Sequence, residues 1–516
     1  MLNLNFKLKL LGLFFSLLFI ISATAEAKDT YNIRDYGAKG DGETIDTEAI
    51  NNAIIAASAK AGGTVYFPAG TYASYSIHLK SNISIYLEQG AILLAASPVG
   101  NIGYDEPEAG ANNNYQDFGH SHWHNSLIWG ENLENISILG PGTIHGKGLT
   151  RGGPSRAPYG NKSIALKSCR NVILKDFSIL NGGHFGILAT GVDNLTIDNL
   201  KIDTNRDGID IDACRNVRIS NCFINSPWDD ALCLKSSYAL GYARSTENVT
   251  ITNCQVSGYD RGTFLNGTYQ RKEGGLVPDK QGPTGRIKFG TESNGGFRNI
   301  VISNCVFEFC RGLALETVDG GILEDVTISN ITMRDIVNSP IFLRLGARMR
   351  GPEGTPIGEL RRININNINV YNADSHFSTL ISGIPGHDIE DIRLSNISIW
   401  YRPLDSAKNK IQNIVPEFEK DYPEPQRFGV LPAYGFFIRH VKNIEMNNIN
   451  IHFLGKETRP AMMLMDAKGV KLENIIAQKA KEAPVLIIED GTDFKIKDFE
   501  GIKDIKIKTI KQRSFE

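Results

Sequence analysis

Short stretches in which aliphatic and polar residues alternate recur along most of the chain. A typical copy is Asn171-Val172-Ile173-Leu174, followed by a second Asn-like corner and another apolar pair. Alternation with a period of two predicts a β-strand with one buried face. Asn suits a sharp bend between two strands, because it tolerates left-handed backbone geometry. Copies begin at Asn135, Asn171, Asn194, Asn216, Asn248, Asn299, Asp325, Arg362, Asp391 and Asn443.

The spacing of these motifs indicates stacked coils. Asn171, Asn194 and Asn216 stand 23 and 22 residues apart, and longer intervals leave room for inserted loops. A period near 22 with several short strands per repeat is typical of a solenoid. We interpret the chain as all-β, a single right-handed parallel β-helix. A leucine-rich repeat is the second interpretation, but no L-x-x-L-x-L frame recurs.

The N-terminal region predicts a leader and a cap. Lys7 and Lys9 precede an apolar run over 10–21 and small-residue A-x-A sites, which is the secretory signal pattern. We therefore predict a signal peptide over 1–27, a β-helix domain over 28–516 and an exported, periplasmic or extracellular protein. A membrane anchor is the alternative, although the run is short for a span. Residues 47–60 have helical spacing after Asp46, an N-cap candidate, so we predict a short capping helix there.

Composition and charge narrow the classes of function. The chain has 41% hydrophobic and 22% charged residues, which is ordinary for a globular protein. A formal net charge of −2 gives no reason to expect nucleic-acid binding, which needs a basic surface. The 51 glycines form no Gly/Ser-rich block, so they fit a fold that turns often rather than a flexible linker.

The seven cysteines favour free thiols. Cys222, Cys254 and Cys305 each follow an Asn at the same point of the recurring motif. We expect these thiols to stack in the core as small hydrophobic groups, rather than to form disulfides. No Cys-x-x-Cys is present, so a zinc site of that type is not predicted.

Candidate catalytic residues stand at one fixed distance along the chain from the motif Asn residues. Thirteen residues after three consecutive motif Asn residues stand His184, Asp207 and Asp229, and Asp230 extends the set. If the coils stack in register, about 4.8 Å apart, these side chains form a column. Carboxylates so close together repel one another and raise the pKa of at least one of them, and this unfavourable arrangement suggests a function. The alternative is that the aspartates only cap turns. Two carboxylates facing one cleft are what glycoside hydrolysis requires.

Several segments share the pattern of one enzyme family. Residues 31–42 (YNIRDYGAKGDG) and 62–72 (GGTVYFPAGTY) look like the opening of many pectin-active β-helices. Asn205-Arg206-Asp207 is similar to an Asn-Thr-Asp stretch, and Trp228-Asp229-Asp230 to an Asp-Asp stretch, of glycoside hydrolase family 28. The chain resembles this family of polygalacturonases and their relatives from about residue 31 to about residue 455, and its fold would be a pectin-lyase-like solenoid.

The resemblance implies a mechanism and a partner. Asp229 would be the general acid, while Asp207 and Asp230 would hold and activate the attacking water, with inversion at the anomeric carbon. The partner would be a galacturonate-containing pectic polysaccharide or oligosaccharide; no cofactor and no metal are expected, and we expect a monomer. Three alternatives remain: a rhamnogalacturonan-active or exo-acting branch, a calcium-dependent lyase with Lys235 or Arg286 as base, and a non-catalytic carbohydrate-binding β-helix.

Two positions depart from the family pattern. Thr284 stands where a Gly-His-Gly histidine is expected, and Ala314-Leu315-Glu316 replaces the Arg-Ile-Lys that grips a uronate carboxylate. Arg286 and Lys288 are candidates to bind that carboxylate from a neighbouring coil, with an exposed strand face as the alternative. Otherwise His184 replaces the imidazole, or the sugar at that subsite differs.

Other residues are weaker candidates. Lys235 and Trp228 are further substrate-binding candidates. His120, His122 and His124 alternate, as metal ligands on a strand do, but we favour a place in the sugar cleft or a loop. The segments 98–125 and 266–284 interrupt the coils and are predicted to wall the cleft, which would favour cutting at chain ends. The remaining candidates for stacking on sugar rings are Trp123, Trp129 and Tyr269.

Overall fold

The computed structural model describes residues 30–109, 113–117, 119–151, 156–271, 283–404 and 410–516. The predicted signal peptide therefore lies outside the described residues, as does part of the predicted loop 266–284. Among the described residues, no helix has both the length and the apolar character needed to span a bilayer.

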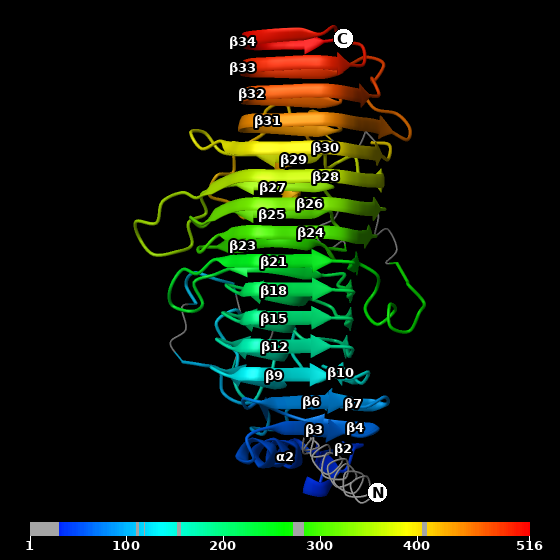
Figure 1. The fold of residues 1–516 in the computed structure, drawn as a ribbon. Coiled ribbons are helices and arrows are strands. Elements are labelled where there is room, and N and C mark those ends of the chain that lie inside the picture. The colour runs from blue at the N-terminus through cyan, green and yellow to red at the C-terminus, as the bar shows by residue number, and fades with distance from the viewer. Residues whose placement is uncertain (1–29, 110–112, 118, 152–155, 272–282, 405–409) are drawn as a thin grey trace, which may run out of the picture.

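The chain winds into a right-handed parallel β-helix, as predicted. One coil consists of β14 (Phe185–Thr190), β15 (Asp193–Asp198) and β16 (Lys201–Asp203), and the next coil of β17 (Asp207–Asp212), β18 (Arg215–Ser220) and β19 (Phe223–Asn225). Each strand pairs in parallel with its counterpart one coil later. Figure 1 shows these coils stacked from the N-terminal to the C-terminal end.

Three parallel sheets result. Beside the strands above, the first holds β5 (Ile77–His78), β8 (Ile128–Glu131), β11 (Lys162–Lys167), β20 (Leu232–Ser236), β23 (Ile287–Ser293), β25 (Leu313–Thr317), β27 (Ile341–Leu345) and β29 (Thr379–Ser382). The second holds β1 (Thr30–Asn32), β3 (Gly63–Phe67), β6 (Ile83–Leu87), β9 (Glu134–Leu139), β12 (Arg170–Lys175) and β21 (Thr246–Thr252). The third holds β2 (Asp41–Ile45), β4 (Gly70–Ser74), β7 (Ala91–Ala95), β10 (Thr143–His145), β13 (Ser178–Leu180) and β22 (Gln255–Ser257).

The strands are longer towards the C-terminus, because strands that are separate in the earlier coils are continuous there. These are β24 (Phe297–Glu308), β26 (Ile322–Arg334), β28 (Glu359–Ala373), β30 (Ile389–Tyr401), β31 (Phe436–Phe453), β32 (Met462–Ala477) and β33 (Leu486–Phe499). The last strand, β34 (Ile505–Phe515), pairs antiparallel with β33 and covers the final coil. Two short 3-10 helices, Ile33–Tyr36 and Pro425–Phe428, lie outside the coils.

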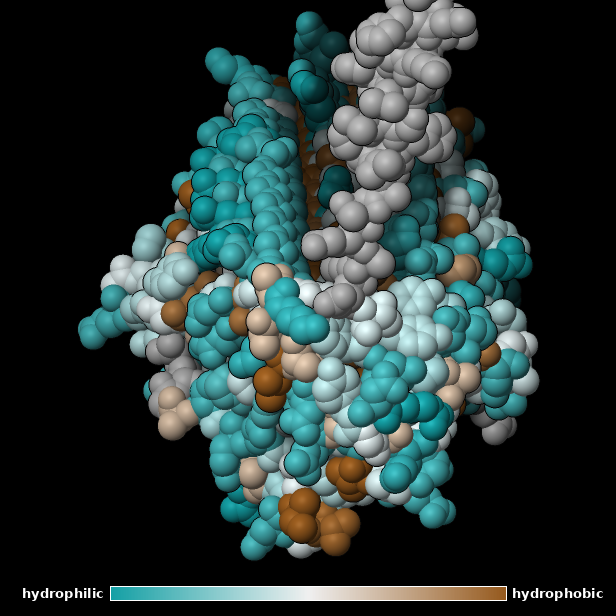
Figure 2. Space-filling view, turned by 60° about the horizontal axis from the view of Figure 1, so that its bottom comes forward, coloured by the Kyte–Doolittle hydropathy of each residue, from teal (hydrophilic) through white to brown (hydrophobic). Residues whose placement is uncertain are grey.

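The motif Asn residues form the predicted corners. Asn171, Asn194 and Asn216 all have φ near 55°, in the left-handed region. Their side-chain amides also hydrogen-bond from coil to coil: Asn194 donates to Asn171 at 3.0 Å, and Asn216 donates to Asn194 at 3.2 Å. Figure 2 shows hydrophilic residues lined up in ridges along the solenoid. The corners therefore supply both the bend and a ladder of amides.

The N-terminal end is closed by α2 (Thr47–Ala59), which confirms the predicted cap. Its apolar face, including Ile50 and Ile54, is fully buried. Asp46 stands at the N-cap position but does not cap the helix with its side chain. Its carboxylate instead accepts hydrogen bonds from the backbone N–H groups of Lys39 and Gly40, so it fixes the preceding loop.

The interior of the coils contains the aliphatic residues of the repeats and the cysteines. All seven cysteines are free and buried, as predicted. Cys254 lies in hydrogen-bond contact with both Cys222 and Cys305. Because these three thiols occupy the same place in neighbouring coils, they pack as a column and not as disulfide partners.

Candidate active site

Three aspartates converge at one edge of the first sheet. Asp207 is the first residue of β17, and Asp229-Asp230 lies in the turn before β20. One carboxylate oxygen from each lies within 4.8 Å of the others. Asp207 and Asp230 are almost completely buried, whereas the Asp229 side chain is 30% exposed. Asp229 is therefore the carboxylate that an entering molecule meets first.

The predicted column is wrong at His184 and at Asp229. The strand register pairs Phe185, not His184, with Asp207, and in the next coil it brings Asp230, not Asp229, level with Asp207. The strands are 22 and then 23 residues apart here, whereas the motif Asn residues are 23 and then 22 apart. His184 is buried beside the carbonyl oxygen of Arg151, at 2.6 Å, and the guanidinium of Arg206, at 3.2 Å. Burial, together with the nearby Arg206 charge, lowers the pKa of His184, so the imidazole is neutral.

Arg206 is a site residue that the sequence analysis missed. Its Nε atom lies 3.0 Å from Asp229 and 3.9 Å from Asp207, so one cation faces two of the three aspartates. The sequence could have indicated this residue, because Arg206 replaces the Thr of the Asn-Thr-Asp motif in glycoside hydrolase family 28. Asp207 is affected differently: burial and the charges of Asp229 and Asp210 raise its pKa well above the usual range.

Asp230 is held by a buried arginine. Arg286 donates from Nε to Asp230 at 2.8 Å and from its terminal nitrogen to Glu424 at 2.5 Å. Arg311 also donates to Glu424, at 3.1 Å. Burial by itself raises the pKa of Asp230, but Arg286, Lys288 and a third cation outweigh it, so the pKa is lowered. These cations therefore favour the ionised form of Asp230, whereas the pKa of Asp207 is shifted in the opposite direction.

Lys288 extends this network. Its ammonium lies 3.5 Å from Glu316 and 3.7 Å from Asp230, and it donates to the Tyr422 hydroxyl at 3.3 Å. Burial raises the pKa of Glu316 to about 7, although Lys288 opposes the shift. The exposed strand face considered for Arg286 and Lys288 is wrong, because each is only 2% exposed. Both are brought to the aspartates, with protein carboxylates already as partners.

A second buried network adjoins Asp207. Lys235 lies 3.2 Å from Glu292 and 3.8 Å from Asp210, and it is buried rather than on the surface. His120 approaches Asp210 at 3.3 Å from the segment between β7 and β8. In the same segment, the backbone N–H of Asp117 donates to Glu292 at 3.2 Å. This segment therefore covers part of the first sheet, as predicted for a wall.

The three alternating histidines do not share one direction. While His120 faces Asp210, His122 is buried and burial lowers its pKa. His124 lies 3.1 Å from Glu131 on β8. A site built from all three histidines is therefore not formed, because the segment is a loop and lacks the alternation of a strand.

The aromatic candidates separate into packing and surface residues. Trp123 is buried and donates from its indole N–H to Thr190. Trp129 donates to Asp105 at 2.8 Å. Trp228 is 41% exposed beside Asp229, with the Arg151 guanidinium 4.8 Å from its ring centre. Trp228 is thus the aromatic candidate placed to meet a sugar at the aspartates.

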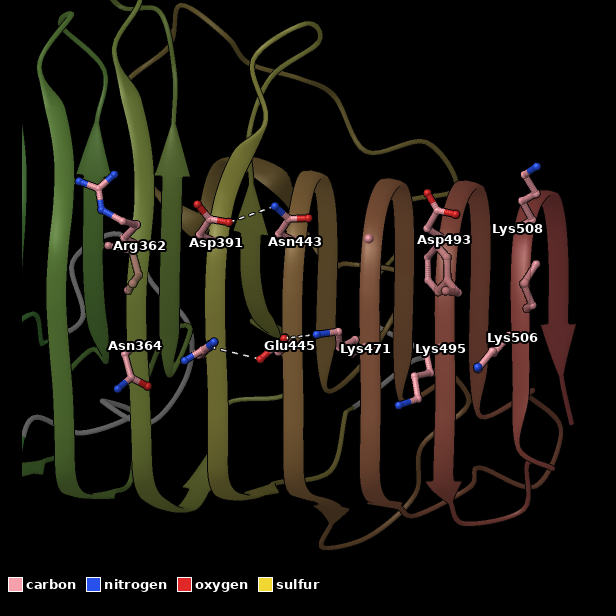
Figure 3. Close-up of a pocket in the computed structure, with 15 residues that line it drawn as sticks. Arg362, Asn364, Asp391, Asn443, Glu445, Lys471, Asp493, Lys495, Lys506 and Lys508 are labelled. Atoms are coloured by element: carbon pink, nitrogen blue, oxygen red, sulfur yellow. Dashed lines mark hydrogen bonds and ion pairs between the residues drawn. The ribbon is translucent and has the colours of Figure 1, made fainter.

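A large hollow lies elsewhere, on the outer surface of strands β28 to β34. Figure 3 shows Lys471, Lys495 and Lys506 projecting from the neighbouring strands β32, β33 and β34 around it, with Glu445 bound to Lys471. Since the three aspartates lie on the first sheet, this hollow is a separate surface.

Comparison with known proteins finds similarity to one family of enzymes. Residues 109–260 match the sequence profile of "Glycosyl hydrolases family 28", and residues 30–138 match "Rhamnogalacturonase A/epimerase, pectate lyase-like". A "Probable polygalacturonase" of Vitis vinifera is 26% identical over 65% of this chain and 73% of its own length. An "Exo-poly-alpha-D-galacturonosidase" of Dickeya chrysanthemi is 31% identical over 34% of this chain and 29% of its own length.

A solved structure agrees in fold. The family 28 exopolygalacturonase of Yersinia enterocolitica superimposes with a TM-score of 0.63 at 19% identity, over 86% of this chain and 78% of that one. The family 28 match contains Asp207, Asp229 and Asp230. The chain is thus similar to glycosyl hydrolases family 28 over this region and is a glycoside hydrolase.

Proposed function

We propose that the protein is an exported enzyme that cleaves glycosidic bonds in galacturonate-containing pectic polysaccharides, with residues 1–27 as its signal peptide and 28–516 as its catalytic unit. The observation that carries this proposal is the convergence of Asp207, Asp229 and Asp230 within 4.8 Å, with only Asp229 exposed. The names of the relatives, a polygalacturonase and an exo-poly-α-D-galacturonosidase, supply the substrate class.

In the proposed mechanism the aspartates divide the work. Asp229 donates its proton to the leaving glycosidic oxygen, because it is the accessible member. Asp230, ionised by Arg286, accepts a proton from the attacking water. Asp207, next to Asp230, orients that water. The C–O bond to the leaving sugar breaks while the water oxygen bonds to the anomeric carbon, so the configuration inverts.

The carboxylate separation makes a sharp test of inversion. Inverting enzymes place the two carboxyl groups about 6.5–9.5 Å apart, and retaining enzymes about 5–5.5 Å. One oxygen of each carboxylate here lies within 4.8 Å of the others, and Asp229 is paired with Arg206 at 3.0 Å. Proton NMR of the first product formed decides the matter: the inverted anomer supports the mechanism, and the retained anomer contradicts it.

We expect uronate recognition to be divided between the two sides of the aspartates. Arg286 and Lys288 already face Asp230, Glu424 and Glu316, so a substrate carboxylate has to share them. Lys235 and the neutral His184 lie beside the aspartates as well. On the exposed side, Trp228 offers a ring face to a sugar, and Arg151 stacked on that ring supplies a cation.

An exo-acting or rhamnogalacturonan-active specificity is the second candidate. Its support is Glu316, a buried carboxyl whose pKa is raised to about 7, where the resembling family has a cation. An ion pair between Asp117 and Arg350, at 2.5 Å, joins two loops beside the first sheet. Loops joined in this way would close one end of a sugar cleft, which favours cutting at chain ends.

Product analysis tests these proposals together. The purified enzyme is incubated with homogalacturonan, rhamnogalacturonan and short uronate oligomers, with Asp229→Asn as control. Release of saturated reducing ends by wild type alone supports hydrolysis, and the preferred polymer and the product length give the specificity. Ultraviolet-absorbing unsaturated products that disappear with a chelator would instead establish a lyase. Binding without any product would establish a carbohydrate-binding protein.

A further inference from the structure

Three side chains from two segments meet away from the aspartates. His124, in the loop between β7 and β8, places its Nε2 atom 3.1 Å from Glu131 Oε2 and 3.4 Å from Glu108 Oε1. The three donor atoms all lie within 4.8 Å of one another. Glu131 ends β8, whereas Glu108 and His124 belong to the loop, so the contact joins the loop to the first sheet.

Each of the three side chains makes a second contact that holds it in place. Glu108 uses Oε2 to accept the backbone N–H of Trp123 at 2.9 Å. Glu131 uses Oε1 for the Lys167 ammonium at 2.9 Å. The His124 ring stacks on Trp129, with 3.9 Å between ring centres. The remaining oxygen of each glutamate therefore points at one imidazole nitrogen, an arrangement in which outer contacts orient the inner donors, as around protein-bound metals.

Protein hydrogen bonds do not satisfy this cluster. The single Nε2 atom carries at most one hydrogen, and it faces two carboxylate oxygens. Glu108 Oε1 is buried and has no hydrogen-bond partner among the described residues. A cation between the three atoms satisfies all of them at once. Bonds of about 2.0–2.2 Å in a tetrahedron put the donors roughly 3.4 Å apart. The two distances from His124 Nε2 to the glutamate oxygens, 3.4 and 3.1 Å, are close to this value.

We propose that Glu108, His124 and Glu131 bind one divalent metal ion of the zinc class. One imidazole nitrogen and two carboxylate oxygens are a recognised ligand set for such an ion. His124 and Glu131 also line a hollow of about 540 Å³, which leaves room for water as a further ligand.

The ion ties down the wall of the active site. Only a short stretch of the same loop separates His124 from His120, which contacts Asp210 in the network beside Asp207. Fastening the loop at Glu108 and His124 to β8 therefore fixes the direction from which His120 enters. The metal takes no part in bond cleavage in this proposal, since it lies at the N-terminal side of the catalytic coils.

Cobalt substitution tests the site directly. Enzyme stripped with a chelator is titrated with Co²⁺ while visible absorption is recorded, because tetrahedral Co²⁺ with a nitrogen ligand gives intense bands. We expect one equivalent to bind to wild type and its affinity to fall at least tenfold in His124→Ala and Glu108→Gln. Zn²⁺ added to wild type is expected to raise Tm and to displace Co²⁺.

Two controls keep the result specific. Asp229→Asn removes a member of the other acidic cluster within 4.8 Å, and it is expected to bind Co²⁺ as wild type does. His452→Ala removes a histidine stacked on Trp400, outside both clusters, and is expected to do the same. Circular dichroism checks that each variant is folded. Absence of tetrahedral bands in folded wild type, or unchanged binding in folded Glu108→Gln, would overturn the proposal.

Discussion

Arg286 donates to Asp230 at 2.8 Å, and both side chains are buried at the edge of the first sheet. The same guanidinium also binds Glu424, so it bridges two carboxylates. This bridge sets the protonation of the proposed base: Asp230 stays ionised although it is buried, because a cation is fixed beside it.

We predict that Arg286→Met shifts the acid limb of the pH–rate profile to higher pH. Asp230 has a lowered pKa in the folded enzyme, and removing the cation raises it, so the base becomes protonated over a wider acidic range. Activity at mildly acidic pH is expected to fall about 100-fold. The measurement is kcat/KM from pH 3 to 9. Arg286→Lys keeps the charge and is expected to recover part of the activity, and Arg298→Met, on an exposed arginine of β24, is the matched control. An unmoved acid limb would contradict the assignment of Asp230.

Asp229→Asn and Asp207→Asn are each expected to lower kcat by roughly 10²–10⁴-fold, the usual contribution of a general acid or base. KM is expected to change much less, because neither variant alters the shape of the cleft. Asp391→Asn is the control, since Asp391 accepts a hydrogen bond from Asn443 on a different surface. Initial rates of reducing-end release provide the readout. A loss at Asp391 as large as that at Asp229 would point to a general defect of folding.

We expect Glu316→Gln to flatten the dependence of Tm on pH. Burial raises the pKa of Glu316 to about 7 in the folded protein, above its ordinary value of 4.5. The folded state therefore binds more protons than the unfolded state between these values, and stability falls as pH rises through that window. Thermal unfolding of both proteins from pH 4.5 to 8 measures the slope. The same slope in the two proteins would rule out Glu316 as its source.

The hydrogen bonds between the corner Asn residues predict that substitutions of Asn194 reduce stability by different amounts. This residue has φ of 55° and exchanges amide hydrogen bonds with Asn171 and Asn216. Asn194→Gly keeps the left-handed geometry and loses only the amide contacts, at a cost of about 1 kcal/mol. Asn194→Ala also pays the left-handed penalty of about 1–2 kcal/mol. Urea unfolding is expected to rank wild type above Gly and Gly above Ala; Ala equal to Gly would show that the bend carries no strain.

Much of the fold followed from local pattern. Alternating residues and the Asn spacing predicted the coils, their corners and the stacked cysteines, because each coil repeats the same short-range preferences. The helix over 47–59 was also predicted from its own periodicity. The motif spacing failed as a ruler because the strands are 22 and then 23 residues apart where the motif Asn residues are 23 and then 22 apart. His184 and Asp229 consequently each lie one position away from the register of Asp207.

The sequence by itself determined a parallel β-helix and predicted Asp207, Asp229 and Asp230 on one edge, since stacked coils bring residues at equal or neighbouring positions together. Only the tertiary structure decided what surrounds them. Glu424 reaches Arg286 across 138 residues, and Glu108 and His124 meet Glu131 through a loop without periodicity. Such contacts depend on where long connections fold back onto the solenoid, and no short-range pattern records that path.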